Sequence, residues 1–171
     1  MMSFFMMINT GEEQSRFEKL YRAYRGLMFY VANRILQNEQ DAEDAVQQAF
    51  MKIAENMDKI DALFSPKTRS YVVTIVENKA IDLYRAKQRT GTVEYGDAAG
   101  LTVEPPEEKG LAGCILQLPP RLRQVILLKY YHGFTLREIA KQLGITQANA
   151  EKLHQRAKSK LREICEKEGI L

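Results

Sequence analysis

The chain has 171 residues, with 25 lysine and arginine residues against 22 aspartate and glutamate residues, and 45% of its residues are hydrophobic. This apolar fraction excludes a disordered chain, and no run approaches the roughly 18 apolar residues that a membrane span needs. The apolar stretch at residues 1–8 lacks the basic region and the cleavage site of a signal peptide. We therefore expect no membrane insertion and a cytoplasmic location.

The net charge of +3 is unevenly distributed along the chain. Residues 1–89 carry a net charge of +1, residues 90–113 carry −4 and residues 114–171 carry +6. The acidic segment also holds five of the ten glycines and two of the five prolines, which is typical of a linker. We therefore predict a tail at 1–14, domains at 15–89 and 114–171, and an acidic linker at 90–113. The basic second domain indicates a polyanionic partner, most simply nucleic acid.

Three helices are predicted in the first domain. Ser15 and Glu18 have the spacing of a capping box, and apolar residues recur every three or four positions after them. Asp41 is expected to cap the second helix. Ser65, followed by proline, is expected to begin the third helix, which runs to about Arg89.

The third predicted helix combines an apolar arc with a polar stripe. The apolar arc contains Val72, Val73, Val76, Ala80, Leu83 and Tyr84. The polar stripe contains Asn78, Asp82, Arg85 and Arg89, within about 60° of one another at 100° per residue. Together with Lys87, this stripe has two interpretations: it follows a nucleic-acid backbone, or it is an ordinary solvated face.

The second domain contains the pattern of a helix-turn-helix motif. Thr135 and Glu138 form a capping box at the start of a short amphipathic helix. Gly144 then supplies the turn, and Thr146 caps a longer basic helix. In such a motif the second helix enters the major groove, where lysine and arginine reach phosphates and glutamine reaches bases. The alternative is a helical hairpin that binds no DNA.

Four sequence segments, spread over both predicted domains, form an ordered series. They are Asp41-Ala-Glu-Asp-Ala-Val-Gln-Gln-Ala-Phe, Asn78-Lys-Ala-Ile-Asp-Leu-Tyr-Arg, Leu118-Pro-Pro-Arg-Leu-Arg-Gln-Val-Ile-Leu-Leu and Glu138-Ile-Ala-Lys-Gln-Leu-Gly-Ile-Thr. The series resembles the successive signatures of sigma-70 family factors, and the layout resembles their extracytoplasmic function (ECF) group. The resemblance spans about residues 15–89 and 114–165. It implies an all-α fold in which two small helical domains, like sigma regions 2 and 4, are joined by a flexible acidic linker.

The resemblance implies two contacts for the first domain. Its second helix is implied to dock on the clamp coiled coil of the RNA polymerase β′ subunit, through Asp44, Gln47, Gln48 and Met51. Its third helix is implied to meet the −10 element of promoter DNA. The residues implied there are Asn78 at a pocket for a flipped base and Arg85, Lys87 and Arg89 on the phosphates.

The second domain is implied to contact the β flap of the polymerase core and to read the −35 element. The residues implied are Thr135 and Arg137 on phosphates, and Lys152, Gln155, Arg156 and Lys158 at the groove. Glu151 stands where relatives usually carry a basic residue, and His154 stands where they often carry an apolar one. The hypothesis for the chain is an alternative sigma factor that directs promoter-specific transcription initiation, with an anti-sigma factor as a further partner.

Two alternatives remain open: a stand-alone helix-turn-helix regulator, and a sigma-like interaction protein that has lost DNA binding. We expect no enzyme, no cofactor and no metal site. The sequence has no glycine-rich phosphate loop, and its two histidines have no nearby nucleophile or ligand residues. Cys114 and Cys165 are explained more simply as structural thiols than as redox sensors.

Overall fold

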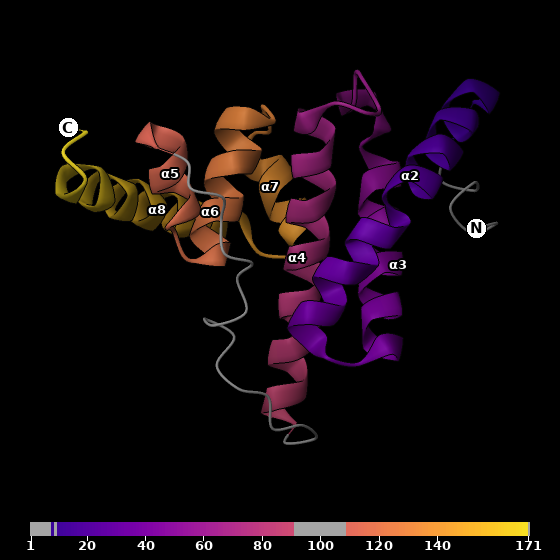
Figure 1. The fold of residues 1–171 in the computed structure, drawn as a ribbon, viewed down its shortest axis with the longest axis horizontal. Helices are drawn as coiled ribbons and strands as arrows, with labels where there is room; N and C mark the ends of the chain where they lie inside the picture. The colour runs from indigo at the N-terminus through magenta and orange to yellow at the C-terminus, as the bar shows by residue number, and fades with distance from the viewer. Residues whose placement is uncertain (1–7, 9, 91–108, 171) are drawn as a thin grey trace. The chain divides into compact units, whose positions relative to one another are not determined.

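The computed structural model describes residue 8, residues 10–90 and residues 109–170. Within these residues every regular element is a helix and no strand occurs, so the all-α prediction is confirmed (Figure 1). The chain divides into two compact units, Met1–Ala98 and Ala99–Leu171. Most of the predicted linker, at 91–108, lies outside the described residues.

Three helices form the first unit. They are α2 (Gly11–Leu36), α3 (Glu39–Glu55) and α4 (Pro66–Arg89), and the short 3₁₀ helix η1 (Met57–Lys59) follows α3. Each of the three long helices packs against the other two. The connection from α2 to α3 is only residues 37–38, and a connection this short joins neighbouring antiparallel helices.

The first helix begins earlier than predicted. The Thr10 Oγ1 accepts a hydrogen bond from the backbone N–H of Glu13 at 3.2 Å, so Thr10 is the cap of α2. Ser15, the predicted cap, lies inside the helix. Thr10 and Glu13 repeat the spacing of a capping box, and the earlier of the two possible boxes prevails because residues 11–14 continue the helix without a break.

The cap of the second helix also differs from the prediction. The side chain of Asn38 accepts a hydrogen bond from the backbone N–H of Asp41 at 3.0 Å, so α3 begins at Glu39. Asp41 therefore lies within the first turn, where the helix dipole favours a carboxylate. The third helix follows the prediction, since Ser65 caps α4 and Pro66 is its first residue.

An aromatic contact lies at the centre of the first unit. Phe17 of α2 and Phe50 of α3 are both completely buried. Their rings meet edge to face with centroids 5.9 Å apart, and Tyr21 lies 4.6 Å from the Phe50 ring. Such ring pairs contribute on the order of 1 kcal/mol beyond the burial of their area. The contact therefore joins α2 firmly to α3.

The helix α4 is buried around most of its circumference rather than on one arc. Its buried residues are Thr68, Tyr71, Val72, Thr74, Ile75, Val76, Asn78, Lys79, Ala80, Ile81 and Tyr84. At 100° per residue these positions point to every side of the helix. The placement of Asn78 on an exposed polar stripe was wrong, because Asn78 is completely buried. Since α4 packs against both α2 and α3, one apolar arc cannot describe it.

The second unit is assembled on its last helix. Its elements are α5 (Gly110–Leu116), α6 (Pro120–Ile126), the π-helical turn η3 (Leu127–Tyr131), α7 (Leu136–Leu143) and α8 (Gln147–Lys167). The helix α8 packs against α5, α6 and α7 (Figure 1). Residues 110–113 belong to α5, although their glycine content favoured the linker.

The helix-turn-helix part of the second unit begins and turns where the sequence predicts. Thr135 caps α7 by accepting from the N–H of Glu138 at 3.2 Å, and Thr146 caps α8 by accepting from the N–H of Asn149 at 3.1 Å. Gly144 ends α7 with φ 68°, a left-handed conformation that glycine adopts without steric cost.

The segment before this motif is not one continuous α-helix, because α6 gives way to the π-helical turn η3 after Ile126. The backbone N–H of His132 bonds to the carbonyl of Leu127 at 2.9 Å, five residues back, which is the wider spacing of a π turn. Tyr130 and Tyr131 in this turn are 60% and 45% exposed. The wider turn shifts the side chains after Ile126 away from the arc that a regular helix gives them.

We predict that Phe50→Ala lowers the free energy of unfolding of the first unit by about 3–5 kcal/mol, because it removes a ring from a fully packed site. The matched control is Phe64→Ala, since Phe64 is 68% exposed and its loss costs less than about 0.5 kcal/mol. Urea unfolding of the full chain, followed by circular dichroism, measures both. Equal destabilisation by the two variants contradicts the packing described above.

Candidate polymerase and nucleic-acid interfaces

The exposed face of α3 brings together the four residues predicted to contact polymerase. Asp44, Gln47, Gln48 and Met51 are all exposed, and Met51 is exposed to 44%. They recur every three or four residues and so lie along one side of the helix, opposite its buried face. A half-exposed methionine among polar side chains is suited to contact with a partner helix.

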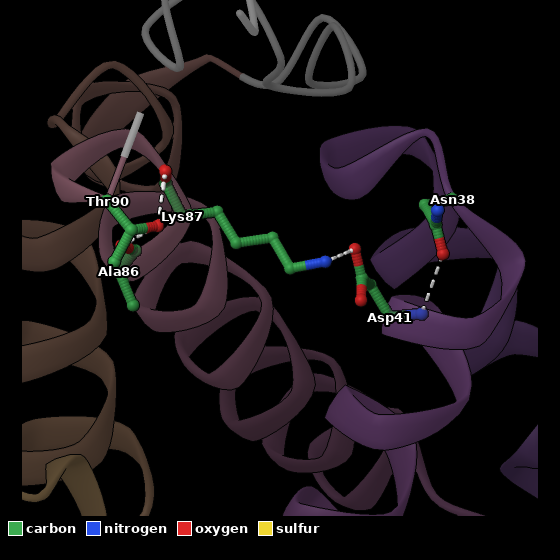
Figure 2. Close-up of polar contacts among 5 residues, drawn as sticks. All are labelled: Asn38, Asp41, Ala86, Lys87 and Thr90. Carbon is green, nitrogen blue, oxygen red and sulfur yellow. Dashed lines mark hydrogen bonds and ion pairs between the residues drawn. The ribbon is translucent and has the colours of Figure 1, made fainter. Parts of the chain in front are cut away.

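Lys87, which the resemblance places on a phosphate, makes an ion pair inside the first unit. Its Nζ donates to the Oδ2 of Asp41, whose own backbone N–H is held by Asn38 (Figure 2). The pair connects the last turns of α4 to the first turn of α3. The side chains of Lys87 and Asp41 are 31% and 11% exposed. The ammonium group is therefore directed at a carboxylate of its own unit.

Two arginines are exposed near the end of α4. Arg85 and Arg89 lie four residues apart on one side of the helix, and the Arg89 Nε donates to the carbonyl of Arg85 at 3.4 Å. The Thr90 hydroxyl closes this end by donating to the carbonyl of Lys87 at 3.0 Å (Figure 2). Asn78 lies two turns earlier and is buried. The residues predicted for the −10 element thus occupy three different environments.

Three of the predicted groove residues share one face of α8. Lys152, Gln155 and Arg156 are exposed and fall within about 100° of one another at 100° per residue. Lys158 is also exposed, but it lies about 160° from Arg156 around the helix. Glu151 lies within about 20° of Lys158 in the same projection, and it accepts a hydrogen bond from the Gln147 side chain at 3.5 Å. The acidic residue therefore lies between Lys158 and Gln155 in this projection, about 40° from Gln155.

The start of α7 presents the remaining two predicted residues. The Thr135 hydroxyl accepts the N–H of Glu138, so its oxygen is engaged as the helix cap. Arg137 is exposed in the first turn of α7. Backbone N–H groups at a helix start favour anions, so Arg137 and the start of α7 together favour a phosphate.

His154 has a structural role that the sequence pattern did not reveal. Its ring is buried, and its Nε2 lies 2.8 Å from the hydroxyl oxygen of Tyr130, in a hydrogen bond that joins α8 to η3. Burial lowers the pKa of His154, and the positive charges of Lys158 and Lys129 lower it further. His154 is therefore neutral at neutral pH. Sequence periodicity could not predict the Tyr130–His154 hydrogen bond, because this bond depends on the π turn η3.

Two further properties concern the part of the chain that the structure describes. Among these residues, no group of three or more histidine, cysteine, aspartate or glutamate side chains is arranged to hold a metal ion. None of the described helices is both long enough and apolar enough to cross a membrane.

Two family models match the chain, in the order of its two compact units. The model for Sigma-70 region 2 matches residues 20–90, and the model for Sigma-70, region 4 matches residues 109–161. The chain belongs to the sigma-70 family. Within this sigma factor the exposed face of α3 lies in region 2, and the helix-turn-helix of α7 and α8 lies in region 4.

Curated sigma factors align with this chain over most of its length. The ECF RNA polymerase sigma factor SigK of Mycobacterium tuberculosis (strain ATCC 25618 / H37Rv) is 24% identical over 166 residues, which are 91% of this chain and 87% of SigK. RNA polymerase sigma factor SigZ of Bacillus subtilis (strain 168) is 27% identical over 152 residues, which are 84% of this chain and 82% of SigZ. This coverage agrees with the ECF type that the sequence motifs imply.

A solved sigma factor also resembles the chain. The sigma factor RpoE from Bartonella quintana, crystallised with the anti-sigma factor NepR, is 18% identical to it. The likeness covers 88% of this chain and 96% of RpoE, with a TM-score of 0.41.

We predict that the second unit becomes less stable as the pH falls below about 6.5. The pKa of His154 is lowered in the folded state, so below the unfolded value of about 6.5 the unfolded state binds more protons and the free energy of unfolding falls. Urea unfolding of the full chain at about pH 7.5 and about pH 5.5 measures this loss. His154→Gln retains a partner for Tyr130 but does not titrate, so it is expected to weaken the pH dependence. An unchanged dependence in this variant rules out His154 as the cause.

Proposed function

We propose that this chain is an alternative sigma factor that binds RNA polymerase core and directs it to promoters with −10 and −35 elements. One observation carries the proposal: region 2 and region 4 match in that order, on two separate compact units. A stand-alone helix-turn-helix regulator needs only the second unit. That alternative function leaves the exposed face of α3 without a role.

In the proposed complex, α3 docks on the clamp coiled coil of the β′ subunit. Met51 supplies an apolar contact, and Asp44, Gln47 and Gln48 supply polar contacts over the two turns of α3 before it, a mixture of apolar and polar groups that is usual in an interface. The opposite side of α3 is already packed on α2 and α4. Docking of the exposed face therefore leaves the core of the first unit intact. The β flap is the proposed partner of the second unit.

The end of α4 is proposed to bind the −10 element. Arg85 and Arg89 are exposed there and are placed to neutralise phosphates of the separated strand. Lys87 keeps its ion pair with Asp41 and so holds this end of α4 against α3. Since Asn78 is completely buried, its proposed contact with a flipped base requires a local rearrangement when DNA binds.

The second unit is proposed to read the −35 element with the shared face of α8. Gln155 suits an adenine edge, while Lys152 and Arg156 suit guanine edges or phosphates. Lys158 is placed to meet the backbone at the flank of the groove. Glu151 lies within about 40° of Gln155 and so borders this face, which leaves the interaction protein without DNA binding as an alternative for the assay below to decide.

The remaining proposals concern partners and location. We propose that the protein acts in the cytoplasm and performs no covalent chemistry on its partners. We also propose an anti-sigma factor as a partner. Exposed apolar side chains on each unit, such as Met51 and Tyr130, offer the surfaces that an inhibitory protein covers.

Substitutions on the shared face of α8 test the promoter function. Lys152→Ala and Arg156→Ala are each expected to reduce run-off transcription by about fivefold or more, because a lost base contact costs about 1–3 kcal/mol. The assay mixes purified bacterial core polymerase, this protein and a library of promoter fragments, and maps the start sites. Lys167→Ala removes the same charge from α8 about 16 Å further along the helix, and it is expected to change transcription by less than about twofold.

The same assay separates the three candidate functions. Start sites that share upstream −35 and −10 motifs support the sigma factor. Core binding without transcripts from any fragment indicates an interaction protein. Binding to duplex DNA in the absence of core, again without transcripts, indicates a stand-alone regulator.

We predict that Met51→Asp weakens binding to purified core by at least about tenfold, because it places a carboxylate at the centre of an apolar contact. Tyr30→Asp is the matched control. It changes a similarly exposed apolar side chain on α2, where Tyr30 is 53% exposed, and its expected effect is less than about twofold. Fluorescence anisotropy of a labelled full chain measures both affinities. Equal losses place the docking surface somewhere other than α3.

A further inference from the structure

Cys114 and Cys165 lie together in the core of the second unit. Cys114 belongs to α5 and Cys165 to the last turns of α8, and their exposed fractions are 1% and 3%. Both are free thiols, and the nearby Cys165 contributes to raising the pKa of Cys114. They share one buried apolar cluster with Leu118, Leu122 and Ile164. Folding thus brings into contact two thiols that are far apart in the sequence.

We propose that Cys114 and Cys165 form a reversible oxidation site, at which a hydroperoxide converts the two thiols into a disulfide that links α5 to α8. The inference rests on the geometry of the second unit. It does not depend on promoter recognition, so either proposal can fail without the other.

The reaction with hydrogen peroxide balances in two steps. The sulfur of one cysteine attacks a peroxide oxygen, the O–O bond breaks, and a sulfenic acid and one water form. The sulfur of the other cysteine then attacks the sulfenic sulfur, the S–O bond breaks, the S–S bond forms and a second water leaves. The two thiols lose two electrons and two protons, and the peroxide is reduced to water.

The surroundings of the pair slow its reaction with peroxide. Burial, the nearby thiol of Cys165 and the nearby carboxylate of Glu168 together raise the pKa of Cys114 to about 11. Since the thiolate is the nucleophile, a thiol that keeps its proton at neutral pH attacks peroxide slowly. Attack on peroxide is therefore slow while the pair stays buried.

Local opening of α5 gives the oxidant access to this buried pair. The helix has only seven residues, and no side chain caps its start. A helix this short is not stable by itself and depends on its packing, so α5 opens more readily than the long α8. A disulfide to Cys165 prevents that opening. Oxidation is therefore expected to hold α5 on the unit.

Oxidation of the full chain with hydrogen peroxide tests the proposal. After alkylation of the remaining thiols and digestion with trypsin without reductant, peptide 110–121 is expected to be linked to peptide 163–167, at a mass two hydrogen atoms below their sum. The product is expected to be monomeric and to revert with dithiothreitol. Cys114→Ser and Cys165→Ser are the matched controls, and neither is expected to give it. Oxidation that yields only intermolecular dimers, or only sulfinic acid, overturns the proposal.

Hydrogen exchange of the wild-type chain gives a second test that needs no folded variant. Oxidation is expected to slow amide exchange in α5 by at least about tenfold, because the crosslink suppresses local opening. Exchange in α2, which belongs to the other unit, is expected to be unchanged. Equal exchange rates of α5 before and after oxidation overturn the proposal.

Discussion

The packing of α4 against both α2 and α3 organises the first unit, and it limits what each helix presents to a partner. The helix α4 is buried on many sides, and its exposed charged side chains lie near its two ends, Lys67 and Arg69 in the first turns and Arg85 and Arg89 in the last. By contrast, α3 buries one face and leaves Asp44, Gln47, Gln48 and Met51 exposed along the other. A helix with one buried face is free to dock as a whole, whereas a helix buried on many sides contributes mainly its two ends. The different proposed contacts of α3 and α4 follow from this difference.

Charge in this molecule is divided between internal pairs and exposed surfaces. Lys87 is directed at Asp41, and Lys158 lies on the side of α8 that carries Glu151 and borders the buried His154. Arg85, Arg89, Lys152 and Arg156 remain exposed. The net charge of +6 on residues 114–171 therefore overstates the number of cations that one DNA surface can meet at once. The direction of each side chain, rather than its presence in the sequence, decides whether it is placed to bind a phosphate.

The sequence predicted the features that depend on residues close together in the chain. The caps at Ser65, Thr135 and Thr146 and the glycine turn at Gly144 are all local, and the structure confirms them. The predicted start of α2 was wrong because two possible capping boxes, Thr10 with Glu13 and Ser15 with Glu18, lie within a few residues of each other. The burial of Asn78 and the contacts Lys87–Asp41, Tyr130–His154 and Cys114–Cys165 were not predicted, because each depends on how separate helices pack. For the candidate site, the family motifs therefore indicated which helices matter, but not which of their side chains are engaged within the unit.

Two small units on one chain share the work of binding a promoter. In the proposed complex the shared face of α8 offers three polar side chains and the end of α4 offers two arginines, and so few contacts with DNA are expected to give weak, salt-dependent binding. When one unit is bound, the other meets its own site at an effective concentration set by the linker. The affinity of the whole chain therefore far exceeds the affinity of either unit alone. Because both units contribute to this affinity, a change in either unit weakens the binding of the whole chain. Both cysteines belong to the second unit, so the proposed disulfide lies within one of the two units and leaves the contacts of the other unchanged.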